Sequence, residues 1–145
     1  MDQLPFFVYG TLRAGLGNHY IVDGLLDGVL DARLPGHQLY SSSLPYVAPA
    51  GPGATVTGEL LLVTPACYQE ALRRLDQMEG YRPGEPDSMY MRARCRAQAR
   101  DKAGEWGERD AWVYLGGTWF DFSPALAVPS GDWKDARRGR AGARR

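Results

Sequence analysis

The stretch Thr64–Gly80, TPACYQEALRRLDQMEG, predicts the one main helix of this 145-residue chain. Thr64 and Pro65 are typical of a helix N-terminus, and Gly80 is typical of the position just after a helix C-terminus. Apolar side chains recur at the i, i+3, i+4, i+7 spacing of one helix face, and polar side chains occupy the opposite face. The apolar positions are Tyr68, Ala71, Leu72, Leu75 and Met78. We therefore expect this face to pack against the rest of the fold.

Glu79 lies on the apolar face of the expected helix, where a charged side chain is unusual. It follows Leu75 by four residues, Leu72 by seven and Tyr68 by eleven, so its carboxylate should point toward the core or into a cleft beside it. Burial disfavours the charged form of a carboxylate and raises its pKa, which makes Glu79 a candidate general base or acid. Two alternatives stay open: Glu79 could fray outward at the helix end, or pair with an arginine such as Arg92.

The chain before this helix contains several short elements. Phe6–Tyr9 reads as a buried strand that runs into an irregular loop, Gly10–His19, with three glycines in ten residues. Tyr20–Leu26 is expected to form a short helical turn, and Gly28–Tyr40 to form two short strands. Ser41–Thr55 is rich in serine, proline and glycine, so we expect a loop there that folds over a cleft.

Strands are also expected on either side of the helix and beyond it. Val56–Val63 reads as a strand whose last four residues are buried on both faces. Residues 90–100 alternate strictly and residues 108–115 alternate as well, which predicts an antiparallel hairpin. The arginine row of the first hairpin strand should face solvent, with Tyr90 and Arg92 as the exceptions to watch. Together these patterns predict an α+β fold, a small, mixed and mostly antiparallel sheet with one main helix packed on it.

Charge is divided unevenly along a chain whose formal net charge is zero. Residues 134–145 contain six Lys or Arg and one acid, which leaves eleven basic and sixteen acidic residues in 1–133. We therefore expect one domain over residues 1–133, followed by a basic, disordered tail. Nucleic-acid binding through the tail is disfavoured, because the rest of the chain has the opposite sign.

Several classes of chemistry are disfavoured by the sequence. Cys67 and Cys95 have no CxxC partner, and His19 and His37 lack the spacing of a metal-ligand set, so we expect no metal. Phosphate-loop, dinucleotide-binding and nucleophile-elbow motifs are missing. No basic leader and no apolar run of membrane-spanning length occurs, which predicts a cytoplasmic protein without a membrane partner. The glycine loop and Glu79 remain as the candidates for a site.

Six segments in this order resemble a known family. They are Tyr9–Arg13 (YGTLR), Asn18-His19, Leu75–Tyr81 (LDQMEGY), Tyr90–Arg92, Val113-Tyr114 and Ser130–Trp133. From residue 5 to about 133 the chain resembles the γ-glutamylcyclotransferase-like, or AIG2-like, family. YGTLR and a D-x-x-E-G-Y helix end are specific in combination, although either motif alone is weak. The resemblance implies a small β-barrel-like fold with flanking helices, a cavity at the YGTLR loop, and Glu79 as the single catalytic residue.

The resemblance also implies a reaction. In this family a γ-glutamyl amide is converted into 5-oxoproline and a free amine when the α-amino group of the substrate attacks its own γ-carbonyl, and no cofactor is needed. Glu79 would act as general base and then as general acid. Arg13 would offset the charge of the carboxylate at the cavity mouth. The substrate-binding residues would be Tyr9, Gly10, Thr11, Leu12, Arg13, Tyr90 and Tyr114, of which Gly10–Arg13 could offer backbone N–H groups to the α-carboxylate or to the oxyanion.

The identity of the substrate amine stays open. The loop between Glu79 and Tyr90 is longer than in many members of the family, and it leaves the leaving-group side of the cavity undefined. A γ-glutamylamine, an isopeptide, a glutamyl-protected metabolite and a peptide all fit, whereas glutathione is disfavoured because the branch that uses it has a different loop sequence. A non-catalytic small-ligand-binding or interaction domain on the same fold is the alternative. The sequence does not specify an oligomeric state.

Overall fold

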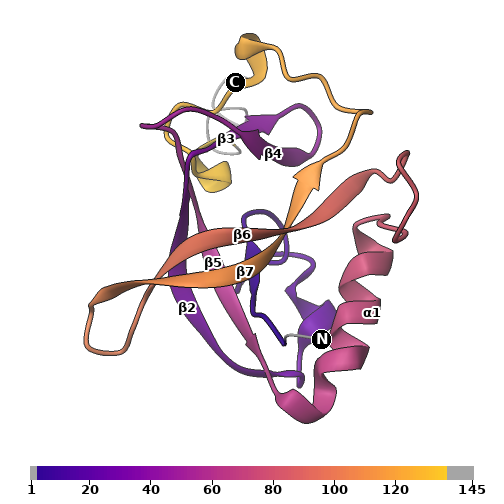
Figure 1. Ribbon diagram of the computed structural model, residues 1–145. Helices are drawn as coiled ribbons and strands as arrows, with labels where there is room; N and C mark the ends of the chain where they lie inside the picture. The colour runs from indigo at the N-terminus through magenta and orange to yellow at the C-terminus, as the bar shows by residue number, and fades with distance from the viewer. Residues whose placement is uncertain (1–2, 137–145) are drawn as a thin grey trace.

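The computed structural model describes residues 3–136, and its centre is a closed five-stranded barrel (Figure 1). The strand order around the barrel is β1-β5-β2-β6-β7. The strands are β1 (Phe6–Val8), β2 (Leu26–Pro35), β5 (Thr55–Val63), β6 (Tyr90–Arg100) and β7 (Trp106–Gly116). Neighbouring strands are antiparallel except β1 and β7, which pair in parallel and close the barrel. The expected α+β fold with a mostly antiparallel, barrel-like sheet is therefore confirmed.

A second sheet of two strands lies beside the barrel. It consists of β3 (His37–Ser41) and β4 (Pro45–Pro49), paired antiparallel. The expectation of a loop over all of 41–55 was therefore wrong for residues 45–49. Serine, proline and glycine around this segment suggest a loop, but Tyr46 and Val47 are fully buried, and burial together with pairing to β3 holds the segment as a strand.

The main helix, α1 (Tyr68–Met78), follows one 3-10 turn, η2 (Pro65–Cys67). Its C-terminus has two hydrogen bonds of a Schellman motif: the Gly80 N–H donates to the Gln77 carbonyl (3.2 Å) and the Tyr81 N–H to the Asp76 carbonyl (2.9 Å). Gly80 has a φ of +64°, a conformation that favours glycine. Glu79 is the C-cap residue directly after Met78, and its own N–H donates to the Leu75 carbonyl at 3.0 Å. The backbone at Glu79 is therefore fixed, and the alternative in which Glu79 frays outward is wrong.

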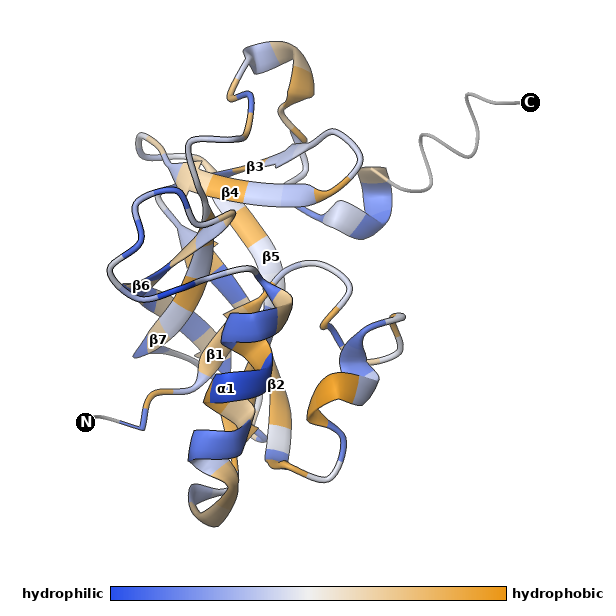
Figure 2. Cartoon of the chain, turned by 90° about the vertical axis from the view of Figure 1, so that its right-hand side faces the viewer, coloured by the Kyte–Doolittle hydropathy of each residue, from blue (hydrophilic) through white to orange (hydrophobic). Residues whose placement is uncertain are grey.

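Apolar side chains form two layers, one inside the barrel and one between the barrel and α1. Because strand side chains alternate, Phe7 of β1 points into the barrel cluster, whereas Phe6 and Val8 belong to the cluster under α1. The helix contributes Tyr68, Leu72, Leu75 and Met78 to the second layer. Hydrophilic and hydrophobic residues alternate along this helix in Figure 2. The second layer therefore ties the C-terminal end of α1 to β1 and β7.

The β6–β7 hairpin is present as predicted, with eleven paired positions. Arg94 and Arg96 are exposed and pair with Asp110 on β7, so this part of the arginine row faces solvent. Arg92 differs: its side chain is 12% exposed, and its Nε donates to Asp76 Oδ1 on α1 at 2.9 Å. Arg92 therefore joins the hairpin to the helix and does not pair with Glu79.

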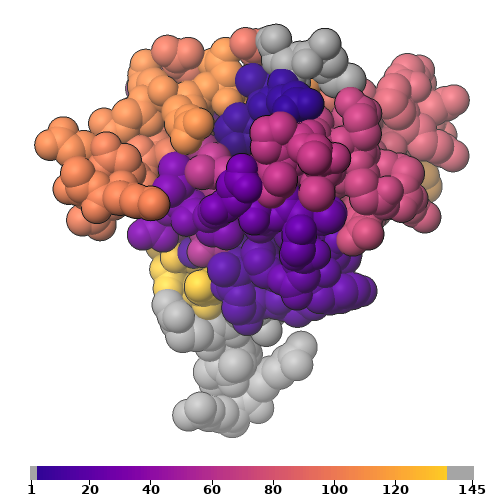
Figure 3. Space-filling view, turned by 90° about the horizontal axis from the view of Figure 1, so that it is seen from below, coloured from indigo at the N-terminus to yellow at the C-terminus, as the bar shows by residue number. Residues whose placement is uncertain are grey.

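Shorter elements complete the fold. The 3-10 helix η1 (His19–Val22) lies against α1, where the Arg74 side chain donates to the Ile21 carbonyl, and Figure 3 shows these purple and magenta segments side by side. A further 3-10 helix, η3 (Pro124–Leu126), follows β7, and residues 133–136 are helical. Residues 137–145, most of the expected basic tail, lie outside the described residues. In residues 3–136, no helix combines the length and the apolar character needed to cross a bilayer.

Candidate active site

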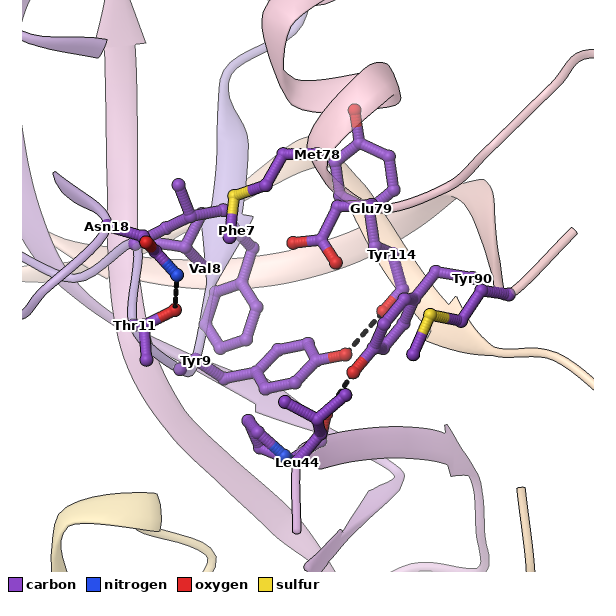
Figure 4. A pocket seen from close by; sticks show the side chains of 14 residues that line it. Phe7, Val8, Tyr9, Thr11, Asn18, Leu44, Met78, Glu79, Tyr90 and Tyr114 are labelled. Carbon is purple, nitrogen blue, oxygen red and sulfur yellow. Dashed lines mark hydrogen bonds between the residues drawn. The ribbon is translucent and has the colours of Figure 1, made fainter. Parts of the chain in front are cut away.

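A small cavity opens where β1 ends, between the following loop and the C-terminal end of α1 (Figure 4). Its volume is about 150 Å³. It is lined by Phe7, Val8, Tyr9, Gly10, Thr11, Leu12, Asn18, Leu44, Pro45, Met78, Glu79, Met89, Tyr90 and Tyr114. The structure thus brings Glu79 together with six of the seven residues that the sequence predicts as substrate-binding.

The carboxylate of Glu79 points into this cavity, toward the side on which the Phe7 ring and the hydroxyl groups of Tyr9 and Tyr90 lie (Figure 4). As a whole the residue is only partly exposed, and no hydrogen bond or ion pair within residues 3–136 engages its carboxylate. Burial among apolar atoms disfavours the charged form and raises the pKa of Glu79 from 4.5 to about 7. Near neutral pH the group therefore exists in both protonation states, as proton transfer in either direction requires.

The loop after β1 lines the same cavity and contains backbone N–H groups without an acceptor. The N–H groups of Gly10, Thr11 and Leu12 make no hydrogen bond to another described residue, whereas the Arg13 N–H donates to the Gly10 carbonyl at 3.1 Å. Gly10 is required by packing, because a Cβ there would lie 2.7 Å from Cγ of Pro45 in β4. The loop therefore provides three unused N–H groups at the cavity, and contact with β4 limits its backbone at Gly10.

Three tyrosines line the cavity, and each hydroxyl group donates to a fixed acceptor. Tyr9 donates to the backbone carbonyl of Tyr114 at 2.5 Å, and Tyr90 to the carbonyl of Pro45 at 2.6 Å. Tyr114 donates to Asp76 Oδ1 at 2.6 Å. Burial raises the pKa of all three phenols, and the hydrogen bond to Asp76 raises the pKa of Tyr114 further. The tyrosines therefore stay neutral and shape the wall, while Glu79 alone among these four groups titrates near pH 7.

Arg13 lies elsewhere. Its guanidinium Nη1 donates to Asp132 Oδ1 at 2.9 Å, its side chain is 8% exposed, and it does not line the cavity. The expectation that Arg13 offsets charge at the cavity mouth was therefore wrong. The physical reason is that a buried guanidinium needs a carboxylate partner, and Asp132, 119 residues later in the chain, occupies that position. Arg13 instead ties the cavity loop to the C-terminal segment.

Several cavity residues were not selected from the sequence. Asn18 donates from Nδ2 to Thr11 Oγ1 at 2.6 Å, which links the two ends of the glycine loop; its place in the Asn18-His19 motif was the signal available. Leu44 and Pro45 come from the segment expected to fold over a cleft, but nothing in its pattern specified that they would line the cavity of Glu79. Met89 comes from the long loop before Tyr90. No local periodicity in the sequence predicts that Met89 lines the cavity.

Comparison with known proteins identifies the family of the chain. A family model described as Gamma-glutamyl cyclotransferase, AIG2-like, matches residues 6–135. The chain belongs to the γ-glutamylcyclotransferase, AIG2-like family. The match extends from the first residue of β1 to the segment after Asp132, so it includes both the glycine loop and the end of α1.

One relative in this family comes from Methanocaldococcus jannaschii and bears the name "Putative gamma-glutamylcyclotransferase". It is 30% identical over 133 residues, which cover 90% of this chain and 96% of that protein. The resemblance to the AIG2-like family that the sequence motifs indicated is therefore confirmed.

Solved structures share the AIG2-like fold. An uncharacterized protein of Pyrococcus horikoshii matches with a TM-score of 0.60 and 23% identity, over 96% of this chain and 97% of that chain. YkqA of Bacillus subtilis matches with a TM-score of 0.66 and 21% identity, over 96% of this chain and 42% of that chain. A yeast γ-glutamylcyclotransferase specific to glutathione matches with a TM-score of 0.56 and 12% identity, over 78% and 68% of the two chains. At these identities the likeness is evidence for the fold alone.

Within residues 3–136, no group of three or more His, Cys, Asp and Glu side chains is arranged to hold a metal ion. Cys67 and Cys95 are free thiols, and burial raises the pKa of the Cys95 thiol. Independence from a cofactor stays a prediction. The titratable carboxylate and the three N–H groups are the chemical resources that the cavity itself offers.

Proposed function

We propose that this chain cyclises the γ-glutamyl group of a small γ-glutamyl amide and releases the amine, with 5-oxoproline as the second product. The proposal is carried by one observation. Glu79, with a pKa of about 7, shares a small cavity with three backbone N–H groups that have no acceptor among the described residues. A proton-transfer group next to preorganised donors is the arrangement that intramolecular acyl transfer requires.

The proton balance fits a single carboxyl group. The α-ammonium of the substrate has three hydrogens and the lactam nitrogen of 5-oxoproline keeps one, so two protons leave the attacking nitrogen. The leaving nitrogen gains two protons and departs as an ammonium ion. Glu79 would accept each proton in its ionised form and return it in its neutral form, so that neither water nor a net proton is consumed.

The attack forms one C–N bond to the γ-carbon and breaks the amide C–N bond. During this step negative charge develops on the γ-carbonyl oxygen. The free N–H groups of Gly10, Thr11 and Leu12 would stabilise either this oxygen or the α-carboxylate of the substrate. A cavity of about 150 Å³ would also hold the glutamyl chain folded, which brings the amine and the carbonyl together and lowers the entropic part of the barrier.

The direct test is to incubate the purified chain with γ-glutamyl amides and to measure 5-oxoproline and the released amine. Glu79→Gln should lower the rate by at least about 100-fold, because a positioned proton-transfer group contributes about 10²- to 10⁴-fold. Glu70→Gln is the matched control: the same substitution on the same helix, at an exposed position paired with Arg73 and Arg74. Full activity of the Glu79→Gln variant would refute the assigned role.

The alternative, a binding domain without turnover, gives a different result in the same assay. Such a domain would bind 5-oxoproline, as measured by calorimetry, and would release amine from none of the amides. The presence of a carboxyl group with a raised pKa in the cavity supports the enzyme, because burial of an ionisable group without a partner costs stability. A cytoplasmic location and a small-molecule partner are part of the proposal.

A further inference from the structure

A second cavity, which we call the amine groove, borders the cavity of Glu79. Its volume is about 790 Å³, and Leu44 and Met89 line both spaces. Figure 4 shows Leu44 at the edge of the first cavity, beside the hydroxyl groups of Tyr9 and Tyr90. The two spaces are therefore neighbours, with Leu44 and Met89 between them. A ligand that occupies both spaces has to pass these two side chains.

The walls of the amine groove are mainly aromatic and apolar. Tyr81, Trp119 and Phe120 line it together with Leu44 and Met89. Trp119 is 76% exposed, yet its indole N–H donates to the Asp87 carbonyl at 3.1 Å, which fixes the ring against the loop that follows α1. In Figure 1 this loop and the segment after β7 rise on the same side of the barrel. A large, exposed and fixed ring is a preformed surface for stacking.

The charged side chains of the groove already have partners. Asp76 accepts hydrogen bonds from Arg92 and Tyr114, and Asp87 lies 3.7 Å from the Arg82 guanidinium. Both carboxylates therefore have a partner within the protein. This arrangement favours an uncharged, apolar occupant over a cationic one, because a cation would compete with an arginine for each carboxylate.

We propose that the amine groove binds the substituent of the leaving amine, and that the preferred substrates are γ-glutamyl amides of amines with an aromatic or bulky apolar group. This inference rests on the proposed function. The sizes of the two spaces agree with it, since the first cavity holds only a small group, whereas the groove falls within the range of about 300–1,000 Å³ that is usual for sites of larger ligands.

The test compares kcat/KM for three substrates: the γ-glutamyl amides of methylamine, of 2-phenylethylamine and of 1,4-diaminobutane. The phenylethyl amide should exceed the methyl amide by about 10- to 100-fold, because burial of a phenyl group strengthens binding in the transition state. The charged diaminobutane amide should show no such gain. Equal values for the methyl and phenylethyl amides, or a preference for the charged amide, would overturn the inference and leave the cyclisation itself established.

A substitution at Trp119 tests whether the amine groove causes the preference for the phenylethyl amide. Trp119→Ala should lower the ratio of phenylethyl to methyl kcat/KM by about tenfold. Trp106→Ala is the matched control. Trp106, on the β6–β7 hairpin, is also exposed, but its ring stacks with Arg33 of β2, and the ratio of this variant should equal that of the wild type. An unchanged ratio in Trp119→Ala overturns the inference. If no 5-oxoproline forms from any of the three amides, the proposed function fails and the inference fails with it.

Discussion

The Tyr114 hydroxyl group donates a 2.6 Å hydrogen bond to Oδ1 of Asp76, and this contact joins β7 to α1 one turn before Glu79. Asp76 also accepts from Arg92 on β6, and its side chain is 16% exposed. The backbone carbonyl of Tyr114 in turn accepts from Tyr9. One carboxylate therefore connects the helix end, both hairpin strands and the cavity wall.

We expect Asp76→Asn to destabilise the chain by about 2–4 kcal/mol, because it leaves the largely buried Arg92 guanidinium without a charged partner. Tyr114→Phe removes one hydrogen bond and should cost about 1–2 kcal/mol. Urea unfolding monitored by circular dichroism measures both values. Asp110→Asn, at an exposed pair with Arg94 and Arg96, is the control and should cost less than about 1 kcal/mol. Equal effects at Asp76 and Asp110 would contradict this account.

Glu79 should make stability depend on pH. A carboxyl group whose pKa rises from 4.5 to about 7 on folding binds protons more tightly in the folded state, so wild-type stability should fall as pH rises from about 4.5 to about 7. At about 1.4 kcal/mol for each pKa unit, the loss is about 3 kcal/mol. Glu79→Gln should therefore be more stable than the wild type at pH 8, and the two should converge at pH 4. Urea titrations at both pH values test this, and a constant difference would exclude a shifted Glu79.

The rate should depend on the same ionisation. If Glu79 takes the first proton from the substrate ammonium, kcat/KM should fall about tenfold for each pH unit below an apparent pKa of about 7. The control Glu70→Gln should retain this limb, because Glu70 lies on the exposed side of the helix. A profile that stays flat between pH 5 and pH 8 would show that another group is the base. The measurement is initial-rate release of amine at subsaturating substrate.

Gly10→Ala should damage the cavity loop. The new Cβ would lie 2.7 Å from Cγ of Pro45, and the proline ring cannot rotate away, so the loop or β4 must shift. We expect a loss of about 1–3 kcal/mol in the free energy of unfolding and a fall in kcat/KM, because the N–H groups move with the loop. Gly17→Ala, where a Cβ meets nothing within 4 Å, is the control in the same loop. Equal behaviour of the two variants would argue against a fixed loop.

Local patterns in the sequence determined the parts of the fold that depend on near neighbours. The spacing of Tyr68, Leu72 and Leu75 predicted the buried helix face, Gly80 predicted its end, and strict alternation predicted the β6–β7 hairpin. The alignment of Glu79 with the apolar positions predicted its direction toward the interior. These features follow from backbone periodicity and capping, which involve residues only a few positions apart.

Only the tertiary structure decided which distant segments meet. Tyr9 and Tyr114 are 105 residues apart and form a hydrogen bond, and Arg13 pairs with Asp132 over a separation of 119 residues. No periodicity in the sequence predicts either contact. The parallel closure of β1 on β7 and the pairing of β4 with β3 are likewise non-local. The family resemblance placed Tyr9 and Glu79 in one cavity, but it assigned Arg13 to the mouth of that cavity. The buried Arg13 guanidinium lies beside the carboxylate of Asp132, and only the tertiary structure brings these two residues together.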